Sequence, residues 1–186
     1  MRLFLLVSGI FFSPGVWSHG IHGIEVGFAG GLLHPLSGAD HLLAAVGMGL
    51  WLSLQTYTRR SVPWHCAALI AGVFLALLAK GALADIEWML ASTLIVTGLF
   101  LYKSLRMPRQ LVAAVITTFF SCHFYAHINE GAATLPYICG FFISTFLLVM
   151  FSIAAGTVMG RRAPAFWTRA VGVLLTAVGV AGFGLA

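Results

Sequence analysis

The amino-acid sequence predicts an all-α protein, a polytopic helix bundle that lies in a membrane. Only 8% of its 186 residues are charged and 60% are hydrophobic, whereas soluble domains carry about 25% charged residues. Apolar stretches recur at the length of about 20 residues that an α-helix needs to cross a bilayer. We therefore expect about six full transmembrane helices in a single domain, preceded by a short, broken or re-entrant N-terminal helix.

Residues 1–18 are predicted to be a signal peptide, which leaves residues 19–186 as the transmembrane domain. A positively charged start, an apolar stretch over residues 3–12 and a break after it are typical of such segments. Cleavage after Ser18 would make His19 the first residue of the mature protein. A first membrane anchor that is not cleaved is the alternative.

The short N-terminal helix is expected over residues 24–38, because about 15 residues are too few to cross a bilayer. We expect it to break at Pro35, since proline removes a backbone donor. The next helix, over residues 40–57, is expected to begin with Ser37 or Asp40 near its N-cap.

The remaining predicted spans are almost uninterrupted apolar stretches, which cover residues 63–83, 86–103, 110–129, 136–159 and 165–185. Basic residues mark alternate connections between the spans, namely Arg59, Arg60, Lys103, Arg106, Arg109, Arg161, Arg162 and Arg169. The positive-inside rule assigns these connections to the cytoplasm. The mature N-terminus is then expected on the outer, periplasmic side.

A first cluster of polar residues reads H-P-x-x-G-x-D-H and contains His34, Asp40 and His41. Two imidazoles and a carboxylate are costly in a bilayer unless a partner satisfies them. A divalent transition metal is the partner that suits these ligand types, and Asp40 is expected to orient one of the imidazoles. A purely structural role, with Asp40 as an N-cap, is the alternative.

A second cluster lies in another apolar stretch and contains His123, His127 and Glu130. On a helix these side chains share one face, and the spacing of the two histidines is the one by which a helix grips a metal ion. Glu130 is expected to hold a second position or to orient His127. The alternative is a polar network that serves helix packing.

The predicted mature N-terminus adds His19 and His22, which together with the free amine could bind a metal ion. A solvated tail is the alternative. We expect no nucleic-acid partner, because no basic stripe with interleaved aromatic residues is present. The expected partners are the lipid bilayer and a divalent metal ion. Whether the chain forms a homo-oligomer is left open by the sequence.

The first cluster, continued to Gly49-Leu50-Trp51, closely resembles the HupE/UreJ family of small bacterial membrane proteins, which are associated with nickel and cobalt uptake for hydrogenase and urease. Residues 120–130 resemble the second motif of the family, F-x-H-G-x-A-H-G-x-E. The chain departs from the family pattern at Phe124 and Ile128, where the motif has glycines, and at Val149, near which members often carry a histidine.

The resemblance implies a multi-pass protein of the bacterial inner membrane that transports Ni²⁺ or Co²⁺. By ligand type alone, imidazole and carboxylate also suit zinc and copper. We therefore expect a permease or facilitator for divalent metal ions, not an enzyme. An intramembrane metal-dependent hydrolase is the alternative, and a haem-binding electron carrier is a more distant one.

The predicted orientation can be tested with topology reporters fused after Gln55 and after Arg161. Both fusions should report the cytoplasm, because both sites border basic connections. A periplasmic signal from either fusion would overturn the orientation.

Overall fold

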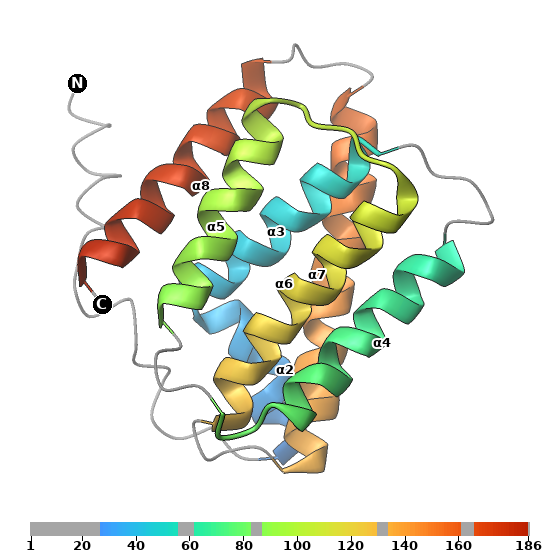
Figure 1. Cartoon of the computed structure of the whole chain (residues 1–186), viewed down its shortest axis with the longest axis vertical. Coiled ribbons are helices and arrows are strands. Elements are labelled where there is room, and N and C mark those ends of the chain that lie inside the picture. Colours follow the sequence, from blue (N-terminus) through green and yellow to red (C-terminus); the bar gives the residue numbers. More distant parts are fainter. Residues whose placement is uncertain (1–26, 56–61, 83–86, 130–133, 161–165, 186) are drawn as a thin grey trace.

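The computed structural model describes residues 27–55, 62–82, 87–129, 134–160 and 166–185. These residues form the helices α2 (Gly27–Ser37), α3 (Ala39–Ser53), α4 (Val62–Leu78), α5 (Glu87–Tyr102), α6 (Arg109–Asn129), α7 (Leu135–Gly160) and α8 (Phe166–Leu185). The prediction of an all-α helix bundle is confirmed (Figure 1). The predicted signal peptide and the candidate ligands His19, His22 and Glu130 lie outside the described residues.

Length and composition agree with a membrane location for this bundle. Within the part of the chain that the structure describes, three segments are long and apolar enough to cross a bilayer, namely Arg109–Ile128, Leu135–Met159 and Phe166–Phe183. Pro63–Leu78 and Glu87–Tyr102 are shorter apolar helices. Two helices end earlier than predicted, α3 at Ser53 and α4 at Leu78.

Helices α2 and α3 together form one broken crossing that packs along α7. They have 11 and 15 residues, against 26 in α7. Gly140 of α7 lies against the backbone of Phe28 in α2, and Gly49 of α3 lies against the backbone of Val149. A side chain on either glycine would collide with that backbone. The short N-terminal helix is thus the first half of a crossing that α3 completes in the same direction as α7.

The break in this crossing lies at Gly38, so its predicted position at Pro35 was wrong. Pro35 is buried inside α2, and the helix continues to Ser37 although proline removes one backbone hydrogen bond. At Gly38 the backbone is extended, with φ −90° and ψ 117°. A Cβ atom on Gly38 would lie 3.0 Å from Oδ1 of Asp40 and 3.2 Å from Nδ1 of His41. The glycine therefore leaves room for two side chains that fold back over the break.

Gly38 is also the N-cap residue of α3 and lies between Ser37 and Asp40, which the sequence places near this cap. The hydroxyl of Ser37 donates instead to the carbonyl oxygen of His34, at 2.9 Å. Asp40 lies in the first turn of α3, where a negative charge interacts favourably with the helix dipole. Its carboxylate therefore stays available to a neighbouring side chain.

Helix α3 lies inside the bundle, and the other helices pair around it (Figure 1). It packs against α7 and α5, while α5 also pairs with α8 and α6 pairs with α4. The hydroxyl of Thr117 donates to the carbonyl oxygen of Ala68 in α4 at 3.0 Å. The hydroxyl of Ser121 lies 2.8 Å from the carbonyl oxygen of Thr117 in its own helix and 3.1 Å from that of Gly72 in α4, and its one proton is shared between these two acceptors. These bonds set the rotation of α6 and hence the direction of its histidines.

The C-terminal end of α3 is tied to the connection between α5 and α6. The indole N–H of the fully buried Trp51 donates to the carbonyl oxygen of Leu105 at 2.9 Å. The side-chain amide of Gln55 donates to the same oxygen at 2.9 Å, and its Oε1 accepts from the N–H of Met107 at 3.0 Å. Gln55 thus satisfies both a donor and an acceptor of one loop.

Replacing Gln55 with leucine should lower the free energy of unfolding by about 1–3 kcal/mol, because the N–H of Met107 loses its acceptor in a partly buried site. The measurement is reversible unfolding in detergent micelles. Gln110→Leu is the matched control, since Gln110 is exposed on α6. Equal stability of the two variants would contradict the role of Gln55.

Candidate metal centre

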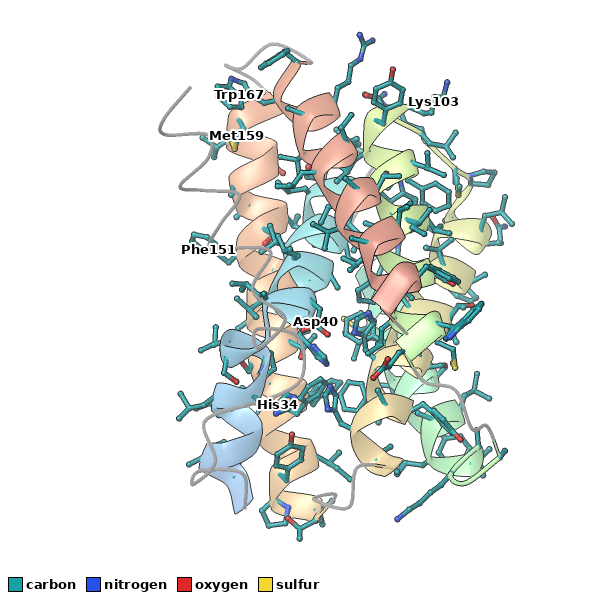
Figure 2. The ribbon with its side chains drawn as sticks, turned by 90° about the vertical axis from the view of Figure 1, so that its left-hand side faces the viewer. His34, Asp40, Lys103, Phe151, Met159 and Trp167 are labelled. Atoms are coloured by element: carbon teal, nitrogen blue, oxygen red, sulfur yellow. The ribbon has the colours of Figure 1, made fainter. Side chains whose placement is uncertain are left out.

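Three histidines from separate helices meet inside the bundle. His34 lies in the last turn of α2, His41 in the first turns of α3 and His127 in the last turn of α6. One nitrogen of each lies within 4.8 Å of one nitrogen of the other two. Figure 2 shows His34 and Asp40 on the inner side of the broken crossing. We call His34, His41 and His127 the three-histidine cluster; it joins the two polar motifs of the sequence.

The tightest contact in the cluster joins the Nε2 atoms of His41 and His127. Both side chains are buried, His41 with 9% and His127 with 4% of its surface exposed. Two neutral imidazole lone pairs that face each other repel. A proton on one nitrogen, or a cation bound by both, removes this repulsion. The arrangement is therefore suited to a shared proton or to a bound cation between α3 and α6.

Asp40 acts on the cluster through the other nitrogen of His41. Its Oδ2 lies 2.8 Å from Nδ1 of His41, although the angle makes this an electrostatic contact and not an aligned hydrogen bond. A carboxylate only accepts, so it favours the proton of His41 on Nδ1 and leaves the Nε2 lone pair toward the cluster. This is how an outer carboxylate orients a metal-binding imidazole, as the sequence predicts for Asp40.

Aromatic side chains of α7 surround the cluster. The ring of Phe141 lies 4.4 Å from that of His127 and 6.0 Å from that of His34, centre to centre. Tyr137 lies 6.0 Å from His34. Phe124 of α6, one of the two departures from the family motif, packs edge-on against Phe141 at 4.9 Å. This apolar wall lowers the local polarity, which strengthens any charge interaction that the imidazoles make.

His123 is separate from the three-histidine cluster, although it shares a face of α6 with His127. Among the described residues, the group of nitrogens that could hold one ion includes His127 and omits His123. The ring of His123 lies 5.6 Å from that of His41 and 4.4 Å from that of Phe119. Its Nε2 is 2.9 Å from the hydroxyl of Thr93 in α5. One helical turn, about 5.4 Å along the axis, gives the two histidines of α6 different partners.

Thr93 and Phe141 are site residues that the sequence analysis missed. Thr93 and Thr97 are spaced by one turn in an otherwise apolar helix, which is a weak signal for an inward polar face. Phe141 offers no signal, because aromatic residues are common in every span. Val149, where family members often have a histidine, packs against Gly49 two turns from Phe141. That position is therefore remote from the three-histidine cluster.

The cluster lies away from one end of the bundle. Figure 2 shows Lys103 and Trp167 at that end, with His34 and Asp40 toward the opposite half. Lys103 belongs to one of the basic connections that the positive-inside rule assigns to the cytoplasm.

Comparison with known proteins identifies the family of the chain. The HupE / UreJ protein family matches residues 6–182. Protein HupE of Rhizobium leguminosarum bv. viciae is 26% identical over 166 residues, which cover 83% of each chain. No solved structure matches the chain. On the family match, which spans both polar motifs and nearly the whole bundle, the chain belongs to the HupE/UreJ family.

Proposed function

We propose that the protein is a membrane permease or facilitator for a divalent transition-metal ion, Ni²⁺ or Co²⁺. The observation that carries this proposal is the convergence of three imidazoles from α2, α3 and α6 on one point inside the bundle. Such groups are expensive in a lipid-embedded interior, and they mark ion pathways when they occur there. A transition-metal cation would bind the nitrogens that otherwise face each other.

The ligand types support a transition metal over Mg²⁺ or Ca²⁺. Hard cations such as these prefer oxygen ligands, whereas imidazole suits nickel, cobalt, zinc and copper. The association of the HupE/UreJ family with nickel and cobalt uptake favours the first two. The negative charge of Asp40 beside His41 would offset part of the charge of the cation.

Transport fits the geometry better than intramembrane hydrolysis. A metal-dependent hydrolase needs a base free to act on a metal-bound water. Among the described residues near the cluster, the carboxylate is that of Asp40, and it already contacts His41. The aromatic wall of Phe141 and Tyr137 also lies directly against the imidazoles.

The proposed route begins on the outer side. His19 and His22 of the mature N-terminus, together with Glu130, would capture the cation and pass it to the three-histidine cluster. Helix movement would then release it inward. Because imidazole binds metals only in its neutral form, protons compete for the same nitrogens, and exchange with protons is a suitable way to release the ion.

Removing one imidazole of the cluster should weaken cation binding. His127→Ala is expected to lower the affinity of the purified protein for Co²⁺ by roughly 100-fold or more, since even outer-shell partners cost about 10–100-fold. Absorption of the bound cobalt and titration calorimetry in detergent measure this. The matched control is His65→Ala, a half-buried histidine of α4, and equal affinities of the two variants would contradict the site. Acidification should weaken binding to the wild type, because protons compete.

Cells that express the wild type should accumulate Ni²⁺ or Co²⁺, and His41→Ala should abolish the gain. Asp40→Asn should lower the uptake rate by roughly 10-fold or more, because His41 loses its orienting carboxylate. Competition with zinc and copper would report the selectivity. Uptake by His41→Ala equal to that of the wild type and of His65→Ala would refute the proposal.

A further inference from the structure

Thr93 links α5 to the histidine of α6 that lies outside the three-histidine cluster. Its side chain is buried, with 9% of its surface exposed. Its hydroxyl oxygen lies 2.7 Å from the carbonyl oxygen of Leu90 and 2.9 Å from Nε2 of His123. Both distances are those of ordinary hydrogen bonds. The hydroxyl therefore bridges a backbone acceptor and an imidazole.

The single proton of the Thr93 hydroxyl determines which group donates and which accepts in the two hydrogen bonds. A threonine hydroxyl has one proton to donate, and a backbone carbonyl only accepts. The short contact with Leu90 is thus a hydrogen bond only if Thr93 donates to that carbonyl. The hydroxyl oxygen can then only accept from His123, so Nε2 of His123 carries the proton. If Thr93 donated to His123 instead, its oxygen and the carbonyl oxygen of Leu90 would lie 2.7 Å apart with no proton between them.

We propose that Thr93 is a positioning residue, which holds His123 in the tautomer protonated on Nε2 and so keeps Nδ1 as the nitrogen that accepts a cation leaving the three-histidine cluster. This inference rests on the proposed transport function. It assigns His123 a second position on the route, distinct from the place where His34, His41 and His127 meet.

The location of His123 suits a second position. Its ring is 5.6 Å from that of His41, whose Nδ1 lies 2.8 Å from the carboxylate of Asp40. Along α6 it is one turn closer than His127 to Arg109, the basic end of the helix. A cation that moves from His127 to His123 therefore advances toward the side that the positive-inside rule assigns to the cytoplasm.

Uptake kinetics of three variants test this role. Thr93→Val keeps the shape of the side chain and removes the hydroxyl, so the maximal uptake rate of Ni²⁺ or Co²⁺ should fall by roughly 10-fold or more. The Co²⁺ affinity of the purified protein should stay near that of the wild type, because the three-histidine cluster is intact. Thr93→Ser should restore the rate. The matched control Thr97→Val, one turn along α5 and also buried, should behave as the wild type.

A spectroscopic measurement tests the tautomer itself, whatever the transport result. Solid-state NMR of the protein labelled with ¹⁵N-histidine in lipid should show a protonated Nε2 on His123, assigned by its loss in His123→Gln. Thr93→Val should mix the two tautomers, and Thr93→Ser should not. A proton on Nδ1 in the wild type, or an unchanged tautomer in Thr93→Val, overturns the role of Thr93.

The two proposals can fail separately. Unchanged uptake in Thr93→Val, with an active wild type, rejects the second position and leaves the permease standing. An inactive wild type whose His123 shows the expected tautomer rejects the permease, and with it the transport role of Thr93, while the hydrogen-bond assignment holds.

Discussion

The contact between Nε2 of His41 and Nε2 of His127 is the constraint on which the centre of this protein depends. It joins the start of α3 to the end of α6, two places far apart in the sequence. Buried imidazoles cost free energy unless they are partnered, and this contact, together with that of Asp40 on His41, supplies part of the partnering. The packing of α3 and α6 therefore has to bring both imidazoles to one point in the interior.

The break between α2 and α3 allows His34 and His41 to approach His127 in the interior of the bundle. An unbroken helix would place His34 and His41 almost two turns apart, at about 10 Å along the axis. With the break at Gly38, the nitrogens of both come within 4.8 Å of His127. The same glycine leaves space for Asp40 and His41 to fold back. Broken helices of this kind are a common way to build an ion site at membrane depth.

The packing around the site accommodates the residues at which this chain departs from the family motif. Phe124 and Ile128 stand where the motif has glycines, yet both are buried, with 1% and 2% of their surfaces exposed. Phe124 packs against Phe141, so it fills the space beside the cluster. The close approach of α6 to a neighbour occurs instead at Gly72 of α4. The site thus keeps its imidazoles while the packing around them changes.

Composition and periodicity by themselves determined the fold class, the approximate spans and the polar motifs, because membrane helices need long apolar stretches and buried ionisable groups stand out in them. The first motif also predicted that Asp40 orients an imidazole, and left open which one. Only the tertiary structure decided that the break lies at Gly38, that His127 joins His34 and His41, and that His123 pairs with Thr93. Spacing along a helix shows which side chains share a face, but the neighbouring helices decide which partner each one meets.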